Sequence, residues 1–319
     1  MHAVVTGAAG FLGSHLCEKL LSQNHKVTGI DNFITGKKQN LRPLYKNPHF
    51  AFIQADLIEG IPKLTDVDRV YHLASPASPI DYIQYPFETM FVNSDGTKHA
   101  LELAKKNKAR FFLASTSEVY GEPLIHPQHE EYWGNVNPIG PRSVYDEGKR
   151  YAEALTMAYH RYHNVDIRII RIFNTYGPRM RSYDGRVIPT FINQALSKQP
   201  LTVFGTGAQT RSFCYVTDLI HGMTLLMESP VNTPCNIGNP HEISMLQLAE
   251  AVNTKTGNQA GIIYKPLPKD DPTRRKPDLS KAAKELGYSP RVSFANGLQK
   301  TIEFFKQQRL IGNEDSSQP

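Results

Sequence analysis

Apolar runs of strand length alternate with longer segments of helical period through the first half of the chain. This alternation predicts an α/β fold, in which a doubly wound parallel sheet carries helices on both faces. A ligand is then expected at the carboxyl ends of the strands. The expected strands are Ala3–Thr6, Val27–Ile30, Phe50–Ile53, Val70–Leu73, Phe111–Ala114 and Ile167–Ile172. The expected amphipathic helices are Phe11–Ser22, Pro86–Lys106 and Val144–Tyr162.

The pattern loosens after about Gly177, where prolines and glycines separate shorter apolar pieces. We therefore expect two domains. Residues 1–175 would form a nucleotide-binding domain, and residues 176–319 a smaller α/β substrate domain that is partly threaded back onto the first.

The composition is that of a globular chain, with 319 residues of which 40% are hydrophobic. Its three cysteines, Cys17, Cys214 and Cys235, are widely spaced and form no C-x-x-C pair. Such cysteines disfavour a disulfide framework or a zinc site and favour a reducing compartment. The chain shows no basic leader and no apolar stretch of membrane-spanning length. We expect a cytoplasmic protein with no membrane partner and no metal.

The net charge is +6, from 36 basic and 30 acidic residues. The two signs are interleaved along the chain, and no basic stripe or aromatic platform suited to nucleic acid stands out. The charge therefore favours an anionic small molecule as partner over a nucleic acid.

The first strand leads into Gly7-Ala8-Ala9-Gly10-Phe11-Leu12-Gly13 and then into a helix. Glycines at this spacing let a pyrophosphate approach the helix N-terminus, as in Rossmann-type domains, although an ordinary strand-to-helix turn is the alternative. The second strand ends on Asp31, where a carboxylate binds ribose hydroxyls and favours NAD over NADP. Lys37 and Lys38 follow soon after Asp31 and would tolerate the 2′-phosphate of NADP, so NADP stays the alternative cofactor. Asp56 is either an adenine contact or a helix N-cap.

Tyr145 is the one tyrosine among fifteen that has a lysine, Lys149, four residues later. On a helix both side chains share a face, where an ammonium lowers the pKa of a phenol and makes it a general base for an alcohol. A solvated helix surface would show the same pair. The strand before it ends in the polar run Ser115–Gly121, at the sheet edge where such folds place their chemistry.

The glycine turn, the Ser/Thr strand end and Tyr-x-x-x-Lys together resemble the extended short-chain dehydrogenase/reductases that act on nucleotide sugars. Within that superfamily, which includes NAD-dependent epimerases and dehydratases, the chain is most similar to the UDP-glucuronate decarboxylases, or UDP-xylose synthases. The resemblance covers nearly the whole chain. The matching segments are His72–Pro79, Ser115–Gly121, Tyr132–Gly140, Tyr145–Arg150, Arg171–Met180, Asp184–Val187, Gln209–Phe213 and Asp271–Asp278.

The resemblance implies a reaction in which NAD oxidises C4 of UDP-glucuronate, the 4-keto acid loses carbon dioxide, and the returned hydride gives UDP-xylose. Tyr145 would take the C4 hydroxyl proton, and Lys149 would hold the nicotinamide ribose. Thr116 would lie near the reacting hydroxyl, with Ser117 and Glu118 at the C5 and C6 end. The catalytic residues implied are Tyr145, Lys149, Thr116, Ser117, Glu118 and Arg275.

The same resemblance implies two sets of binding residues and a homodimer. The substrate-binding residues implied are Thr116, Glu118, Tyr145, Asn174, Arg186, Arg211 and Arg275. Motif and resemblance together place around the cofactor Gly7, Gly10, Phe11, Leu12, Gly13, Asp31, Asn32, Phe33, Thr35, Gly36, Asp56, Leu57, Leu73, Ser75, Ala114, Tyr145, Lys149, Thr175 and Arg186.

Two positions depart from the family pattern. Phe91 stands where relatives carry a substrate-contacting lysine, and Arg181 where they carry His or Asn. A nucleotide-sugar 4-epimerase or 4,6-dehydratase is the alternative enzyme, although dehydratases carry Asp at the position of Ser117. An NAD-binding regulatory protein is the non-enzymatic alternative.

Overall fold

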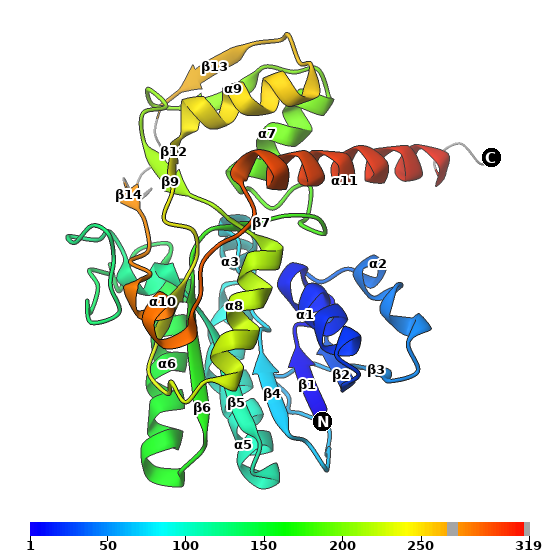
Figure 1. The fold of residues 1–319 in the computed structure, drawn as a ribbon, viewed down its shortest axis with the longest axis vertical. Coiled ribbons are helices and arrows are strands. Elements are labelled where there is room, and N and C mark those ends of the chain that lie inside the picture. The colour runs from blue at the N-terminus through cyan, green and yellow to red at the C-terminus, as the bar shows by residue number, and fades with distance from the viewer. Residues whose placement is uncertain (267–273, 316–319) are drawn as a thin grey trace.

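The computed structural model describes residues 1–266 and 274–315. The start of the expected segment Asp271–Asp278 therefore lies outside the described residues. A large parallel sheet forms the lower lobe of the molecule, and a smaller lobe lies above it (Figure 1).

The large sheet has seven strands in the order β11-β6-β5-β4-β1-β2-β3, and every pair in it is parallel. This order confirms the doubly wound fold, because the chain reverses direction across the sheet between β1 and β4. The first six strands begin and end within a few residues of those expected. The strands are β1 (His2–Thr6), β2 (Lys26–Asp31), β3 (Phe50–Gln54), β4 (Arg69–His72), β5 (Arg110–Thr116), β6 (Ile167–Ile172) and β11 (Cys235–Ile237).

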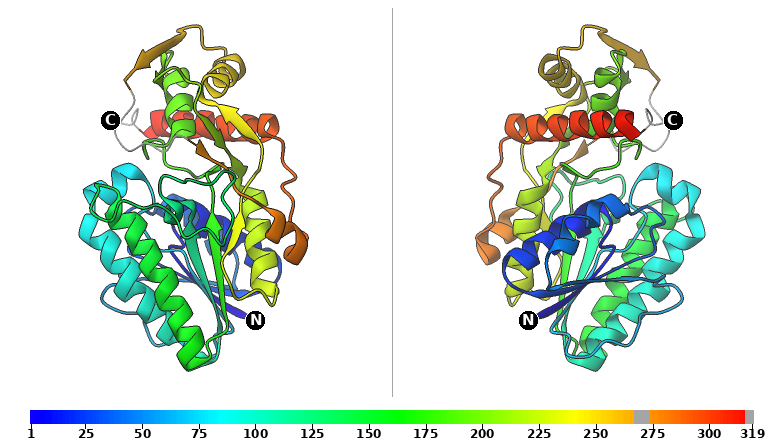
Figure 2. Two further views of the ribbon diagram at one scale, coloured as in Figure 1. Left: turned by 90° about the vertical axis from the view of Figure 1, so that its left-hand side faces the viewer. Right: turned by 90° about the vertical axis from the view of Figure 1, so that its right-hand side faces the viewer.

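Helices cover both faces of this sheet (Figure 2). On one face, α1 (Phe11–Ser22) packs against α8 (Val216–Glu228) in an apolar cluster. On the other, α5 (Thr97–Asn107) packs against α6 (Ser143–His163) in a second cluster. Because both faces are covered, the strands other than the edge strand β3 are buried along most of their length, which explains their continuous apolar runs.

The helix expected over Pro86–Lys106 is interrupted. It consists of α4 (Pro86–Phe91), a π-helical turn at Val92–Gly96, and α5. The Asn93 side chain donates hydrogen bonds to the Thr89 carbonyl at 2.8 Å and to Ser75 Oγ at 3.0 Å. Side-chain capture of a helical carbonyl accompanies such widened turns, which often border functional sites.

The smaller lobe contains short sheets and three principal helices. The order β12-β9-β14 forms one of its sheets, and β14 pairs with β9 so that Arg275 lies opposite Arg211. Its elements are α7 (Val187–Leu196), β8 (Leu201–Phe204), β9 (Thr210–Ser212), β12 (Glu242–Ser244), α9 (Met245–Thr256), β13 (Ile262–Lys265), β14 (Arg274–Arg275) and α11 (Phe294–Asp315). The remaining elements are α2 (Lys38–Leu41), α3 (Pro79–Gln84), β7 (Thr175–Tyr176), β10 (Cys214–Tyr215), α10 (Ser280–Leu286) and 3-10 turns at Leu44–Lys46 and Ser117–Tyr120.

The chain returns from the smaller lobe to the large sheet. α8 and β11 both follow residue 175, yet α8 packs on β6 and β11 pairs with β6 as the edge strand. The second half of the chain is thus threaded back onto the first. The division at residue 175 stays a prediction, since these two elements complete the lower lobe.

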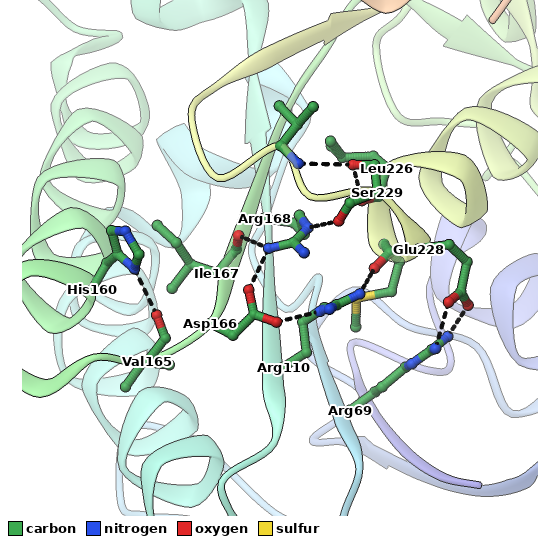
Figure 3. Close-up of polar contacts among 12 residues, drawn as sticks. Arg69, Arg110, His160, Val165, Asp166, Ile167, Arg168, Leu226, Glu228 and Ser229 are labelled. Atoms are coloured by element: carbon green, nitrogen blue, oxygen red, sulfur yellow. Dashed lines mark hydrogen bonds and ion pairs between the residues drawn. The ribbon is translucent and has the colours of Figure 1, made fainter. Parts of the chain in front are cut away.

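A polar cluster ties the returning segment to the amino edge of the sheet (Figure 3). Arg168 is buried and donates to Asp166 at 2.5 Å and to the Ser229 carbonyl at 2.7 Å. Arg110 donates to the same carboxylate and to the Met227 carbonyl, each at 2.6 Å. These arginines cap the carbonyl end of α8, where positive charge is favourable.

Among the residues described, none of the helices combines the length and apolar character needed to cross a bilayer.

Candidate active site

A cavity of about 650 Å³ lies at the carboxyl ends of the sheet strands, where the smaller lobe meets the larger one. A second, smaller hollow lies over the ends of β2 and β3. Gly7 and Gly10 line both hollows, so the two adjoin at the turn after β1. This is the point where the strand order reverses, as expected for a dinucleotide.

The turn between β1 and α1 fits an anion. Gly7 has a φ of +70°, and a Cβ on it would lie 2.9 Å from the backbone nitrogen of Ala74. A Cβ on Gly13 would lie 2.0 Å from the Gly7 carbonyl oxygen, so α1 approaches β1 only because that side chain is absent. α1 begins with no side-chain cap and no acid in its first turn. Phe11 and Leu12 border the cavity there, with the positive end of the helix dipole.

Asp31 ends β2 and is held by the backbone. Its carboxylate accepts hydrogen bonds from the N–H groups of Ala9 at 2.9 Å and Phe33 at 2.7 Å. Burial raises the pKa of Asp31, and these donors lower it in part. A Cβ on Gly36 would lie 2.8 Å from its Oδ1. Phe33 and Gly36 therefore support Asp31 and are not among the lining residues, so their contact with a cofactor stays a prediction.

Asp56 lines the smaller hollow together with Asn32 and Leu57. Its carboxylate accepts from Asn32 Nδ2 at 3.0 Å and from the Ile58 N–H at 2.9 Å. Residues 57–59 form a turn, so the helix N-cap alternative for Asp56 is wrong. The carboxylate closes a local turn instead, as short acidic side chains often do.

Tyr145 and Lys149 lie on one face of α6, as their spacing predicts. Lys149 Nζ lies 5.9 Å from the centre of the Tyr145 ring and donates to the Ala114 carbonyl at 3.0 Å. Burial raises the pKa of Tyr145 to about 12, although a hydrogen bond with Thr116 lowers it in part. Burial also lowers the pKa of Lys149 to about 7. The expected lowering of the phenol pKa is therefore wrong for this site, because burial outweighs it.

The end of β5 supplies hydroxyl groups to the cavity. Ser115 donates to Glu153 Oε1 at 2.6 Å, which fixes its side chain. Thr116 Oγ1 accepts from the Glu118 N–H at 3.2 Å and so begins the 3-10 turn that follows the strand. Thr116, Ser117 and Glu118 all line the cavity. This turn delivers three consecutive polar residues to one place.

Glu118 lies between two arginines. Arg142 donates from Nη2 to Glu118 Oε2 at 2.5 Å, and Arg275 donates from Nη1 to Oε1. Arg275 is buried, and its Nη2 has no hydrogen-bond partner. Asp146 is buried beside them with Oδ1 unpartnered, and burial together with the charge of Glu118 raises the pKa of Asp146 to about 7. This cluster therefore holds two guanidinium groups, Arg142 and Arg275, and two carboxyl groups, Glu118 and Asp146. The Nη2 of Arg275 is its one buried donor without a hydrogen-bond partner among the described residues.

The smaller lobe and the segment before it contribute the rest of the lining. Asn174, Thr175, Arg186 and Arg211 line the cavity. Arg186 donates to the carbonyl of Ala77, another lining residue, at 2.6 Å. The pairing of β14 with β9 brings Arg211 and Arg275 to the same lobe edge.

Tyr82, Arg142 and Arg181 are three polar residues among those lining the cavity to which the sequence assigned no role. Tyr82, on α3, stacks on Tyr145 with ring centres 5.2 Å apart, and its buried hydroxyl has no partner. Arg142 precedes Tyr145 by one helical turn, a spacing that could have marked it. Arg181 pairs with Asp81 across the cavity. For Tyr82 and Arg181 the signal is proximity to the site, which appears only in the folded chain.

Comparison with known proteins places the chain in a family. Residues 4–301 match the family model described as GDP-mannose 4,6 dehydratase. UDP-glucuronic acid decarboxylase 1 of Arabidopsis thaliana is 53% identical over 315 residues, which span 99% of this chain and 72% of that protein. The chain belongs to the UDP-glucuronic acid decarboxylase family. Decarboxylase 1 of Xenopus tropicalis is 50% identical over 96% of this chain and 72% of its own length.

Solved structures similar to this decarboxylase family member share the fold over nearly its full length. UDP-glucuronic acid 4-epimerase from Bacillus cereus, in complex with UDP-glucuronic acid and NAD, has a TM-score of 0.85 at 34% identity, covering 97% of this chain and 100% of that one. UDP-glucose 4-epimerase from Thermotoga maritima has a TM-score of 0.86 at 29% identity, with the same coverage.

The two departures from the decarboxylase family pattern lie in different surroundings. Phe91 is 47% exposed on α4 and is not among the residues that line the cavity. Arg181 lines the cavity and is engaged by the buried Asp81, which also accepts from Ser78 Oγ at 2.7 Å. Position 91 thus lies outside the lining of the cavity of this chain.

Proposed function

We propose that this chain is a UDP-glucuronate decarboxylase, which converts UDP-glucuronate to UDP-xylose and carbon dioxide with NAD as a recycled cofactor. The observation that carries the proposal is the buried, unpartnered Nη2 of Arg275 in the cavity that holds Tyr145. A guanidinium donor suits a carboxylate, and a buried tyrosine beside hydroxyl donors suits an alcohol. A uronic acid presents both groups.

NAD fits the turn after β1 and the smaller hollow. The uncapped start of α1 would receive the pyrophosphate, and Asp31 the adenosine ribose. Lys149 would hold the nicotinamide ribose, since it borders the cavity four residues from Tyr145. Bound NAD would accept hydride from C4, return it in the last step, and add a positive charge that favours ionisation of the phenol.

Tyr145 takes the proton of the C4 hydroxyl as that carbon becomes a ketone, and Thr116 orients the same oxygen. The product is a β-keto acid, so the C5–C6 bond breaks with release of carbon dioxide. Its electron pair is delocalised as an enolate onto the C4 oxygen, where the Tyr145 and Thr116 hydroxyls stabilise it. Water then supplies a proton to C5, and C4 is reduced by the returned hydride while Tyr145 gives its proton back to the C4 oxygen, which yields the pentose.

Ser117 separates this chemistry from dehydration. A 4,6-dehydratase needs an acid at this position to protonate the leaving hydroxyl, and a serine hydroxyl is far too weak an acid. Asn174, Arg186 and Arg211 would hold the diphosphate of the UDP group, since all three line the cavity on the side of the smaller lobe.

The test incubates the purified protein with NAD and UDP-glucuronate labelled with ¹³C at C6. Proton NMR should show UDP-xylose, and ¹³C NMR an equal amount of labelled bicarbonate. Unchanged substrate contradicts the proposal. A C4-inverted uronic acid with its label retained identifies a 4-epimerase instead, the activity in the name of the Bacillus cereus neighbour.

We also propose that the chain forms a homodimer through α4 and α6. These helices pack together and leave large apolar side chains exposed: Phe87 at 69% and Tyr151 at 52%. A contiguous exposed apolar surface of this kind marks an interaction face. Sedimentation equilibrium should show a dimer that Phe87→Glu dissociates, while Leu310→Glu, on the distant α11, leaves it intact. A monomeric wild type contradicts this.

We propose the cytoplasm as the compartment. Cys17, Cys214 and Cys235 are buried and form no disulfide, as in proteins of reducing compartments. A tagged chain should fractionate with a cytosolic marker, and recovery with sedimented membranes would contradict the assignment.

A further inference from the structure

Arg142 stands at the amino end of the helix that carries Tyr145. It holds Glu118 Oε2, while Arg275 holds Oε1, so each carboxylate oxygen has its own guanidinium. The two arginines differ in the N–H donors that they have left to bind a ligand. Arg275 keeps a buried donor without a partner, whereas the Arg142 guanidinium lies over the Tyr82 ring, 6.0 Å from its centre.

The substrate of the proposed reaction adds a second carboxylate to this cluster. Arg275, with one free donor and one bound to Glu118, is the group placed to receive it. When it does, Glu118 on Nη1 and the sugar carboxylate on Nη2 share the charge of Arg275. Arg142 is then the cation that Glu118 does not share.

We propose that Arg142 is a positioning residue for decarboxylation: it retains Glu118 as an ionised carboxylate beside Arg275 while the carboxylate of the sugar binds the free Nη2 of Arg275. This inference rests on the proposed function of the site. It assigns a role to a side chain that neither motif nor resemblance marked.

The surroundings of Glu118 show why an arginine is needed. Glu118 is buried, which raises the pKa of its carboxyl, yet Arg275 and Arg142 together bring that pKa below its ordinary value. The titratable and charged groups facing it are Tyr82 from α3, Arg142, Tyr145 and Asp146 from α6 and its start, and Arg275 from β14. Within the described part of the chain, its cationic neighbours in this set are the two arginines.

An ionised Glu118 serves the loss of carbon dioxide. A carboxylate bound by an unshared arginine is stabilised relative to neutral carbon dioxide, which slows bond cleavage. A second, fixed negative charge in the cluster reduces that stabilisation. Protonation of Glu118 should therefore tighten binding of the uronate and slow its decarboxylation at the same time.

The experiment measures kcat and KM for UDP-glucuronate from about pH 5 to about pH 9 in wild type, Arg142→Gln and Arg142→Lys. Arg69→Gln is the matched control, because it breaks an Arg–Glu ion pair at the amino edge of the sheet. In Arg142→Gln we expect kcat to fall about tenfold at neutral pH, KM not to rise, and the acidic limb of kcat to move up by about one pH unit or more. Arg142→Lys should recover part of this shift, and Arg69→Gln should show none.

Thermal unfolding and retained NAD show whether each variant is folded. A folded Arg142→Gln protein with a raised KM and an unmoved acidic limb overturns the inference, since that result describes a packing role. If Arg142→Gln unfolds, Arg142→Met replaces it, and an unmoved acidic limb in that variant is equally contrary.

Calorimetric binding of UDP-glucuronate over the same pH range separates this inference from the proposed function. Binding should tighten as Glu118 takes up a proton, at higher pH in Arg142→Gln than in wild type. A wild type that binds but releases no carbon dioxide overturns the proposed function, while the shift in binding still decides the role of Arg142. A wild type that does not bind UDP-glucuronate overturns both.

Discussion

Tyr145 and Lys149 show how burial changes a pair whose spacing is simple. Both side chains are buried, and each has its pKa moved toward the neutral form, to about 12 for the phenol and about 7 for the amine. A neutral pair is less costly to bury than an ion pair in the same place. The site therefore stores the proton on Tyr145 until substrate and cofactor change its surroundings.

Tyr145→Phe tests the base. The variant should lose about a thousandfold in kcat, within the range that a positioned proton acceptor contributes, because the C4 proton has no other acceptor at that place. NAD binding, followed by fluorescence titration, should remain close to wild type. Tyr159→Phe is the control, since Tyr159 lies on the same helix but donates to Glu102 at 2.7 Å. Unaltered turnover in Tyr145→Phe would refute the assignment.

Lys149→Met tests the burial of the amine through stability. The native pKa of Lys149 lies below its ordinary value, so in the range between the two values the unfolded chain binds more protons and stability rises with pH. Below about pH 7 both states are protonated and the full penalty for burying the charge is present. The variant should therefore gain more in Tm over wild type at about pH 6 than at about pH 9. An equal or reversed difference contradicts a lowered pKa.

At the scale of elements, the contact between β1 and α1 makes the anion site. The glycines bring the uncapped start of the helix against the sheet edge, so that local backbone geometry rather than any side chain forms the cradle. The π turn between α4 and α5 is a second such feature, since it directs Asn93 toward Ser75 on the cavity wall.

Gly13→Ala should abolish retention of NAD. The added Cβ would lie 2.0 Å from the Gly7 carbonyl oxygen, so α1 must move away from β1. The cofactor released on denaturing the purified protein measures the effect. Gly257→Asn is the control, because Gly257 has a φ of +70° in open space at the end of α9 and Asn tolerates that conformation. Full cofactor content in Gly13→Ala would contradict the assigned cradle.

At the scale of the whole molecule, the two edges of the large sheet have different roles. The carboxyl edge carries the cavity, and the amino edge carries the arginine cluster that ties α8 to the sheet (Figure 3). The cavity and the arginine cluster are separated by the length of the strands. A substitution in the cluster should therefore change the stability of the fold without touching the residues of the cavity.

Arg168→Met tests this separation. The change removes the guanidinium donor from the carbonyls of the buried Ile167 and the partly buried Ser229, and should lower the free energy of unfolding by about 2 kcal/mol. Urea unfolding measures the loss, and kcat should stay within about twofold of wild type. Arg161→Met, on the last turn of α6, is the matched control. A large fall in the kcat of Arg168→Met under conditions where the variant is fully folded would show that the amino edge also affects catalysis, and would contradict this prediction.

The amino-acid sequence by itself determined what depends on neighbours along the chain. Apolar periodicity set the first six strands, and the spacings of Gly7, Gly13, Tyr145 and Lys149 set the anion turn and one helix face. These are local geometries, fixed by the backbone repeat of a strand or helix. The helical segment expected over Pro86–Lys106 is present but contains a π turn, at which the Asn93 side chain donates to the Thr89 carbonyl.

Tertiary structure alone decided what depends on contacts between distant segments. Arg142 and Arg275 meet Glu118 from 24 and 157 residues away, and Tyr82 stacks on Tyr145 from another helix. The pKa values of Tyr145 and Lys149 follow from burial, which no spacing reveals. Periodicity fixes where a side chain points from its own element, whereas its solvation and charge partners are fixed only when the elements pack.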